Sequence, residues 1–353
     1  MPTMSSFSLL RTSGLILGLV FLVALFKTLR STPGRRMYVN TFFLLGSGLI
    51  LVSLFPNIIN SPAAFFSLSN VKGGRIITLL IVANIALLLF ALYINKRTYQ
   101  IKSQINQFIE KVVSSETSKN ASNENLSEFI VVLIPAYNEA ENLKMLLPKI
   151  PSSIHGKIVK ALIVDDGSSD STGIVAEANN AILIKHPFNR GGGAALRTGY
   201  QFAKQNHATI IVTMDADGQH DPRELVNLTT PLLEKKADFV IGSRTLGSFD
   251  SYSRTRILGL YFFNFLLTVL MGIKVTDCSS GYRALNLSAL SQIRLRQDQY
   301  HTAELIIDAA KNGVKILDVP IHVSPRYSGE SKKGHNLFYA FRFLRTILTS
   351  WWA

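Results

Sequence analysis

The sequence predicts an α/β domain with a mostly parallel sheet, preceded by a bundle of transmembrane α-helices. Two observations predict this arrangement. Long apolar stretches are concentrated in residues 1–110, whereas from Phe129 onward short apolar runs alternate with helical patterns. Such alternation is typical of a mostly parallel sheet covered by helices. A chain of 353 residues with 47% hydrophobic content is long enough for both parts.

Residues 1–110 are expected to form a membrane module. It would hold about three helices and a trailing polar helix, the three lying near residues 8–27, 37–56 and 74–95. The second and third apolar stretches are long enough to cross a bilayer. The first spans only if polar Thr12 and Ser13 are included, so it is the weakest span. A signal peptide is the alternative for it, but no small-residue cleavage pattern follows.

Basic residues predict the orientation of these spans, because Lys and Arg are enriched in cytoplasmic loops. Four of them follow the first span (Lys27, Arg30, Arg35 and Arg36). Two lie between the second and third spans (Lys72 and Arg75), and three follow the third (Lys96, Arg97 and Lys102). The larger groups lie after the first and third spans. We therefore expect a multi-pass membrane protein with its N-terminus outside and everything after Ile94 in the cytoplasm.

Net charge and cysteine content limit the kinds of partner and of metal site that this protein can have. Much of the formal net charge of +14 flanks apolar segments, where it matches anionic lipid headgroups. No nucleic-acid-binding motif accompanies it, so a lipid bilayer is the expected partner and nucleic acid is not. Cys278 is the single cysteine, which excludes an intramolecular disulfide and a multi-cysteine metal site and fits a reducing compartment.

The rest of the chain divides into a linker and the α/β domain. Residues 111–128 become rich in Ser, Asn and Glu and are predicted to be a linker, and residues 129–333 form the domain. Two apolar segments with basic and aromatic residues, near 254–273 and at 334–353, are predicted to be helices in the membrane interface. Buried core helices are the alternative. Interface helices together with a membrane bundle would also favour a homo-oligomer.

The motif MDADGQH places Asp215, Asp217 and Gln219 on a turn directly after the apolar strand Thr209–Thr213. Carboxylate and amide oxygens are the ligands that Mg²⁺ and Mn²⁺ prefer, and these cations usually keep positions open for water or phosphate. The motif therefore favours a divalent cation that holds a diphosphate. A solvated turn is the alternative if the motif is taken alone.

Three other polar blocks follow strands of the same domain: PAYNEAENL after the first, VDDGSSDST after the second and NRGGGAALRTGY after the third. Ligands of parallel α/β sheets bind at the carboxyl ends of strands. Of Asp165 and Asp166, one is expected to cap or brace the turn, and the other could accept a hydrogen bond from a nucleobase or ribose. The glycines permit close backbone approach, and the following helix N-terminus favours an anion.

Together the four blocks resemble the family 2 glycosyltransferases, which have the Rossmann-like GT-A fold. The similarity covers about Phe129 to Lys333. Further blocks, GSR at Gly242–Arg244, TDCSSGYRA at Thr276–Ala284 and PRYSGESKK at Pro325–Lys333, resemble the polyprenyl-phosphate hexosyltransferases, which act on dolichyl or undecaprenyl phosphate.

The resemblance implies roles for individual residues. Nucleotide-sugar contacts would come from Pro135, Tyr137, Glu139, Val164, Asp166, Asp215 and Ala216. Asp215, Asp217 and Gln219 would surround a Mg²⁺ or Mn²⁺ ion. The catalytic set would be Asp217 with the phosphate-binding cations Arg244, Arg326 and Lys332. The acceptor side would be lined by Asp277, Ser280 and Arg283.

Some of these side chains, and others near them, have simpler explanations. Arg283 could form a structural ion pair, Glu304 could be a charge on an exposed helix face, and Lys333 could be a solvated neighbour of Lys332. His220 and His301 are not expected to bind metal, because neither has a second ligand three or four residues away.

The implied reaction moves a hexose from a nucleotide-diphosphate sugar to a polyprenyl phosphate, with inversion at the anomeric carbon. A lipid phosphate is already ionised at neutral pH, so cations are needed more than a strong base. Three alternatives remain: a transferase with another lipid or a soluble acceptor, a processive polysaccharide synthase, and a membrane scaffold with a degenerate transferase domain. The Gln-x-x-Arg-Trp motif expected of the processive synthase is absent.

Overall fold

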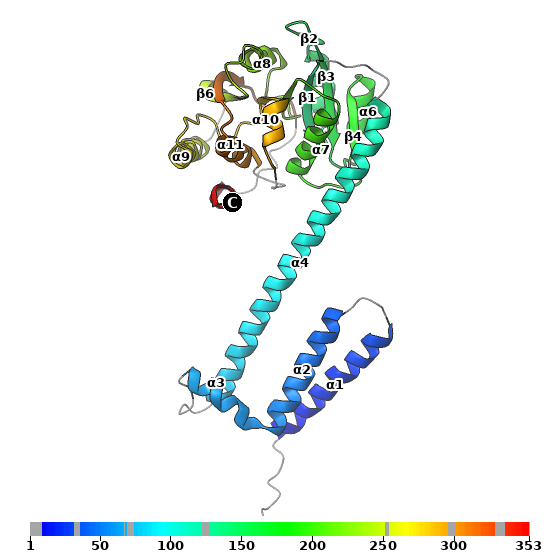
Figure 1. Cartoon of the computed structure of the whole chain (residues 1–353), viewed down its shortest axis with the longest axis vertical. Helices are drawn as coiled ribbons and strands as arrows, with labels where there is room; N and C mark the ends of the chain where they lie inside the picture. Colours follow the sequence, from blue (N-terminus) through cyan, green and yellow to red (C-terminus); the bar gives the residue numbers. More distant parts are fainter. Residues whose placement is uncertain are drawn as a thin grey trace, which may run out of the picture. The chain divides into compact units, whose positions relative to one another are not determined.

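The computed structural model describes residues 9–31, 36–66, 68, 74–121, 128–250, 254–295, 301–328 and 336–352. The chain forms two compact units, Met1–Ile101 and Lys102–Ala353 (Figure 1). Each unit has its own internal packing, and the candidate site lies in the second.

The described part of the first unit is helical. Its elements are α1 (Leu9–Ser31), α2 (Arg36–Leu54), the 3₁₀ turn η1 (Pro56–Ile59), α3 (Asn60–Phe65) and the start of α4 (Gly74–Ala121). Helices α1 and α2 pack closely because glycines face each other. A Cβ atom on Gly18 would lie 3.0 Å from the carbonyl oxygen of Gly46, and the reverse holds for Gly46. Small residues allow such close backbone approach between apolar helices.

The expectation of three membrane spans is supported only in part. Within the described residues one helical segment, Ile76–Ile101 with a mean hydropathy of 2.6, is long and apolar enough to cross a membrane. Gly46–Leu54 and Asn57–Phe65 would count as a second span only together, and they are bent by 101°. The apolar part of α1, Thr12–Val23, is shorter than a span. The predicted linker also differs, because α4 continues as a helix to Ala121.

The second unit is built on an eight-stranded sheet with the order β2-β3-β1-β5-β7-β6-β8, in which β4 also pairs with β3. The strands are β1 (Ile130–Ala136), β2 (Ser153–Ile154), β3 (Lys157–Asp165), β4 (Ile182–Lys185), β5 (Ile210–Thr213), β6 (Phe239–Phe249), β7 (Arg283–Asn286) and β8 (Ile316–Val323). The sheet is mostly parallel, as expected, with two exceptions: β7 is antiparallel to both of its neighbours, and β2 is antiparallel to β3.

The direction of β7 positions the site. Thr213 at the end of β5 pairs with Arg283 at the start of β7. The segment before β7 therefore lies at the carboxyl end of β5, where the MDADGQH turn begins. Two blocks that are distant in sequence meet there because of this antiparallel pairing.

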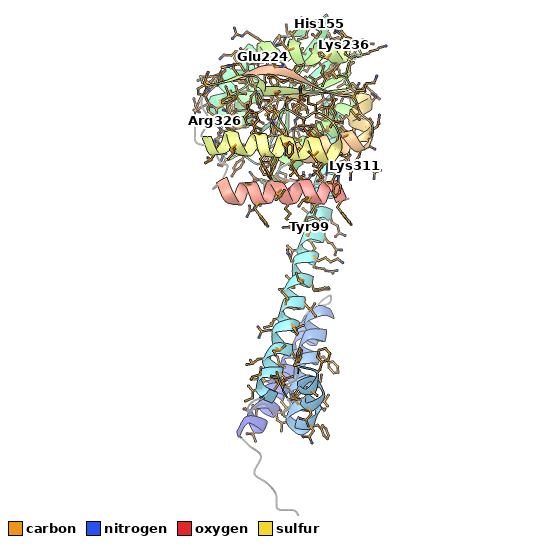
Figure 2. The ribbon with its side chains drawn as sticks, turned by 90° about the vertical axis from the view of Figure 1, so that its left-hand side faces the viewer. Tyr99, His155, Glu224, Lys236, Lys311 and Arg326 are labelled. Atoms are coloured by element: carbon orange, nitrogen blue, oxygen red, sulfur yellow. The ribbon has the colours of Figure 1, made fainter. Side chains whose placement is uncertain are left out.

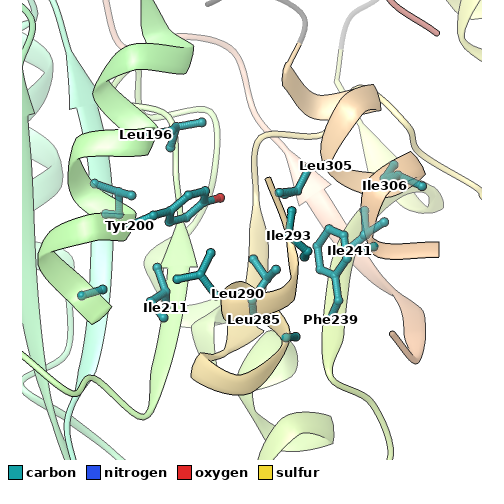
Figure 3. Packing of buried hydrophobic residues seen from close by; sticks show 14 of the residues in the cluster. Leu196, Tyr200, Ile211, Phe239, Ile241, Leu285, Leu290, Ile293, Leu305 and Ile306 are labelled. Atoms are coloured by element: carbon teal, nitrogen blue, oxygen red, sulfur yellow. The ribbon is translucent and has the colours of Figure 1, made fainter. Parts of the chain in front are cut away.

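Helices cover both faces of the sheet. They are α5 (Ala140–Leu146), α6 (Thr172–Ala178), α7 (Gly192–Gln205), α8 (Leu225–Leu233), α9 (Arg254–Met271), α10 (Leu287–Gln292), α11 (His301–Lys311) and α12 (Asn336–Trp352), with the 3₁₀ turns η2 (Leu147–Lys149) and η3 (Pro222–Glu224). Val131 and Leu133 of β1 pack with α7 and α9 to α12, whereas Ile130 and Val132 pack with α5, α6 and α8. This alternation follows from the two-residue period of a strand. The core therefore has two parts, one on each face of the sheet. Figure 3 shows some of the part that contains Val131 and Leu133, where Tyr200 of α7 faces Leu290 of α10.

Helices α9 and α12 lie side by side on the outside of this core (Figure 2). Phe263 and Phe343 join them by an edge-to-face contact with ring centroids 4.8 Å apart. Both helices also expose large apolar side chains, including Leu258, Phe265 and Trp352. The two segments predicted as interface helices are thus helices with one buried and one exposed apolar face.

Candidate functional site

The MDADGQH turn presents two carboxylates in different environments. The Asp215 side chain is half exposed, whereas Asp217 is buried. Asp217 Oδ2 lies 2.9 Å from Arg326 Nη2, and Asp217 Oδ1 accepts a hydrogen bond from the Gln219 backbone N–H at 3.1 Å. Burial and the nearby charge of Asp215 raise the pKa of Asp217 to about 6, against the opposing effect of Arg326. The pair therefore favours a cation between the carboxylates.

Residues 324–328, called here the C-terminal strap, fold over this turn. Ser324 and Gln219 exchange two hydrogen bonds, and the Tyr327 N–H donates to the Asp217 carbonyl at 3.1 Å. The Tyr327 ring lies against Gly218, whose φ of 75° is a conformation that favours glycine. Lys149 Nζ donates to the Tyr327 hydroxyl at 2.9 Å. The strap brings Arg326 to the turn, while the predicted Lys332 and Lys333 lie outside the described residues.

The residues of the turn fit a magnesium or manganese ion. Asp215, Asp217 and the Gln219 amide supply oxygen ligands of the preferred type, and such ions take only one or two carboxylates from a protein. The described part of the chain contains no group of three His, Cys, Asp or Glu residues that could hold a metal ion. His220 Nε2 lies 3.9 Å from Asp215 Oδ2, and its ring packs on Tyr282.

The TDCSSGYRA block lies directly against the turn. Thr213 Oγ1 donates to the Gly281 carbonyl at 2.8 Å, and a Cβ atom on Gly281 would lie 2.7 Å from Asp215 Oδ1. Asp277 is fully buried, and its Oδ2 accepts from Arg244 Nε at 2.6 Å and from the Arg244 backbone at 3.1 Å. Two predicted groups, a phosphate-binding cation and an acceptor-side carboxylate, thus form one buried ion pair.

Arg283 and Ser280 support this loop from inside. The Arg283 guanidinium is buried and donates to the carbonyl oxygens of Ser280, Thr302 and Cys278. Burial lowers the pKa of Arg283 to about 10. Ser280 Oγ accepts from the Tyr282 N–H at 3.2 Å. The alternative of a structural role for Arg283 thus fits the contacts, although the partners are backbone carbonyls rather than a carboxylate.

Asp166 holds the glycine-rich loop. Its carboxylate accepts from His186 Nδ1 at 2.7 Å and from the backbone N–H groups of Arg190 and Gly191 at 3.0 and 2.7 Å. His186 is fully buried, and its Nε2 lies 2.9 Å from Thr198 Oγ1 on α7. Asp166 therefore braces the loop, and Asp165 accepts from the Ser168 N–H.

The remaining residues predicted to contact the nucleotide sugar lie at the ends of β1, β3 and β5. Tyr137 is exposed and Pro135 half-buried, whereas Val164 and Ala216 are buried in the core. Glu139 Oε2 accepts from Asn142 Nδ2 at 2.5 Å, and Asn142 Oδ1 accepts from Ser328 of the strap at 2.9 Å. The first block and the strap are thus connected beside the MDADGQH turn.

Three residues that sequence reasoning missed contribute to the site: His186, Asn264 and Tyr327. Tyr327 lies inside the PRYSGESKK block, so this motif could have identified it from the sequence. His186 and Asn264 act through buried contacts that no local pattern marks. Glu304 is also buried, at 4% exposure, so the interpretation of it as an exposed helix-face charge is wrong.

Comparisons with known proteins match the domain that carries this site. The profile of the family described as glycosyl transferase family 2 matches residues 131–294. An uncharacterized protein of Methanocaldococcus jannaschii is 35% identical, over 64% of this chain and 93% of its own. The UDP-N-acetylglucosamine–dolichyl-phosphate N-acetylglucosaminyltransferase of Methanococcus voltae is 33% identical, over 63% and 95%. The polyprenol monophosphomannose synthase of Mycolicibacterium smegmatis is 31% identical, over 59% and 82%.

Among solved structures, glucosyl-3-phosphoglycerate synthase from Mycobacterium tuberculosis in complex with Mn²⁺ and UDP-glucose is similar with a TM-score of 0.52. The identity is 21%, over 67% of this chain and 82% of that chain. The same enzyme has also been solved with Mg²⁺ and UDP. At this identity the likeness establishes the fold.

Proposed function

Because this chain belongs to glycosyl transferase family 2 and is a glycosyltransferase, we propose that it transfers a hexose from a nucleotide-diphosphate sugar to a polyprenyl phosphate. The transfer takes place at the cytoplasmic face of a membrane and inverts the anomeric carbon. The relatives named for dolichyl or polyprenol phosphate support the acceptor class.

One observation carries the proposal: three distant blocks meet at the end of β5. The acidic turn contacts the loop before β7 through Asp215 and Gly281, and it contacts the strap through Asp217 and Arg326. Carboxylates for a cation and guanidinium groups for a phosphate therefore lie at one edge of the sheet. Such an edge suits a reaction between two phosphate-bearing molecules.

The chemistry requires that two anions approach each other. A divalent ion held by Asp215, Asp217 and Gln219 would neutralise the leaving diphosphate. Arg244 and Arg326 are each fixed by a carboxylate, so their guanidinium groups are positioned before a phosphate arrives. The acceptor phosphate is itself the nucleophile and needs no strong base, which leaves charge neutralisation as the main task of these residues.

Membrane attachment follows from the apolar surfaces. The segment Ile76–Ile101 supplies a span, and the multi-pass arrangement with a cytoplasmic catalytic unit is part of the proposal. The exposed apolar faces of α9 and α12 would lie in the interface, where aromatic and basic side chains such as Trp352 and Arg345 are favoured. A lipid-linked phosphate would reach the site from that surface.

The test uses the purified full chain with Mg²⁺ or Mn²⁺, a short polyprenyl phosphate, and radiolabelled UDP-glucose, UDP-N-acetylglucosamine and GDP-mannose in separate reactions. We expect a labelled lipid that partitions into chloroform with one donor. In parallel reactions, 3-phosphoglycerate or diacylglycerol is supplied instead of the polyprenyl phosphate. If only one of these becomes labelled, that molecule and not the lipid phosphate is the acceptor. No transfer with any donor and acceptor would refute the proposal.

A further inference from the structure

We infer that Asn264 of α9 is a positioning residue for the Arg244–Asp277 pair, linking the exposed apolar face of α9 to the acceptor side of the site. The inference deepens the proposed function and rests on it, because it assigns a device that orients the cation facing the lipid phosphate.

Asn264 is buried and binds the backbone on both sides of Asp277. Its side-chain N–H group donates to the Thr276 carbonyl, and its Oδ1 accepts from the Cys278 N–H at 2.9 Å. A single side chain therefore uses both its donor and its acceptor on the two residues that flank Asp277. The Asp277 backbone is held in place by this pair of hydrogen bonds.

One turn further along α9, Thr268 makes a similar contact. Its Oγ1 accepts from the Val275 N–H at 3.1 Å. Residues four apart lie on the same face of a helix, so Asn264 and Thr268 form a polar row against residues 275–278. On the far side of that loop, Asp318 Oδ2 accepts from the Thr276 N–H at 2.7 Å. The loop is fixed between α9 and β8.

The fixed loop in turn sets the position of Arg244. Asp277 Oδ2 lies 2.6 Å from Arg244 Nε and also accepts from the Arg244 backbone. Moving the Thr276–Cys278 backbone would move this carboxylate, and the guanidinium would move with it. Asn264 thus acts on Arg244 through Asp277, without contacting the reacting groups itself.

The opposite face of α9 is apolar and exposed. Leu258, Phe265 and Val269 are 74%, 68% and 62% exposed, and their spacing places them on one side of the helix, away from Asn264. The same helix therefore carries the surface proposed for the membrane and the polar row that holds the loop. Seating α9 in a bilayer would fix the loop that bears Asp277.

The first experiment measures donor and acceptor Michaelis constants for Asn264→Leu and Thr268→Val in the full chain. We expect Asn264→Leu to raise the KM for polyprenyl phosphate about tenfold, because two hydrogen bonds to the loop are lost, with less than a twofold change in the donor KM. Thr268→Val should show a smaller change in the same direction. Asn264→Asp, which keeps an acceptor for the Cys278 N–H, should lie between wild type and Asn264→Leu.

Thr229→Val is the matched control. Thr229 is a buried threonine of α8 on the opposite face of the sheet, where its hydroxyl donates to the Leu225 carbonyl. Its loss should lower the melting temperature and leave the acceptor KM unchanged. If Thr229→Val and Thr268→Val change the acceptor KM equally, or if Asn264→Leu changes donor and acceptor constants alike, the inference is wrong.

A second readout needs no activity. Cys278 is itself a buried residue of the loop, so its alkylation by iodoacetamide reports how firmly the loop is held. We expect Asn264→Leu to speed alkylation at least tenfold over wild type and Thr229→Val to leave it unchanged. Unchanged alkylation in Asn264→Leu would overturn the inference. If wild type makes no glycolipid, the proposed function fails, and alkylation alone still decides whether Asn264 holds the loop.

Discussion

Arg326 Nη2 lies 2.9 Å from Asp217 Oδ2, so the C-terminal strap is joined directly to the central carboxylate of the MDADGQH turn. Arg326 compensates part of the charge that the two aspartates of this turn bring together. A buried carboxylate whose pKa rises to about 6 is costly to keep charged, and the compensation allows it to remain available for a cation.

Replacing the central carboxylate should abolish transfer. Asp217→Asn keeps the shape of the side chain but removes a charged metal ligand, so we expect a loss of about a hundredfold or more in kcat. Asp221→Asn is the control, because Asp221 is a partly exposed carboxylate four residues away that pairs with Arg223. The measurement is the transfer rate at saturating donor, with circular dichroism to verify folding. Comparable rates in the two variants would remove Asp217 from the metal site.

Gly218 should tolerate no side chain. Gly218→Ala meets two obstacles, the φ of 75° and the Tyr327 ring. Gly156 has a φ of 77° and no atom within 4 Å of an added Cβ, so Gly156→Ala measures the backbone cost alone. We expect Gly218→Ala to lower the free energy of unfolding by about 1–3 kcal/mol more than Gly156→Ala does, as measured by thermal or denaturant unfolding. Tyr327→Ala should remove most of that difference, and failure to do so would show that the ring is not the obstacle.

Loss of the His186 contact should weaken donor binding. His186→Leu leaves the Asp166 carboxylate with fewer partners and loosens the loop at Arg190 and Gly191. A hydrogen bond to a charged group contributes about 1.5–3 kcal/mol, so we expect the donor KM to rise about tenfold while the acceptor KM changes little. The neighbouring exposed Lys185→Ala is the control. Equal donor constants for the two variants would speak against this role.

Cys278 should be inert in the folded protein. Burial raises the pKa of its thiol to about 12, and the charge of Asp277 adds to the effect. At pH 8 only about one thiol in ten thousand would be ionised, and the thiolate is the reactive form. Titration with Ellman's reagent should detect no thiol in the native protein and one per chain after unfolding in guanidinium. A full equivalent in the native state would contradict the burial of Cys278.

The chain has two tryptophans, Trp351 and Trp352, both at the end of α12, so tryptophan fluorescence reports on that helix alone. If α12 lies in the interface, reconstitution into vesicles of brominated phospholipid should quench the emission relative to unbrominated vesicles. Trp352 is 86% exposed and Trp351 40%, so Trp352→Phe should remove most of the quenched component. Equal emission in both kinds of vesicle would place α12 away from the lipid.

Much of the catalytic unit could be predicted because its signals are local. Strands β1, β3, β4 and β5 were expected from apolar runs, and each is followed by the polar block that brings residues such as Asp166 and Asp217 to the sheet edge. The expectations of a family 2 glycosyltransferase and of an enzyme are confirmed by the family match and the relatives. The membrane module was predicted less well, because apolar composition does not determine where a helix bends or how far α4 continues.

What could not be predicted depends on contacts between residues distant in the sequence. Arg244 and Asp277 are separated by 33 positions, and nothing local indicates that one neutralises the other. The burial of Arg283 likewise involves the Thr302 carbonyl, 19 positions away, and the pairing of β7 with β5 and β6. A strand motif does not reveal the direction in which its strand will run, so the antiparallel course of β7 within a mostly parallel sheet could not be predicted.

The antiparallel course of β7 has a practical consequence for redesign. The loop proposed to line the acceptor side begins after α9 and ends at Arg283, whose pairing with Thr213 fixes the end of the loop. The loop can therefore be replaced as one segment, because α9 and β7 fix its two ends. Grafting residues 276–282 from a relative of different acceptor preference should transfer that preference, provided that the graft keeps its length, because a one-residue slip would turn every side chain of β7 to the other face of the sheet.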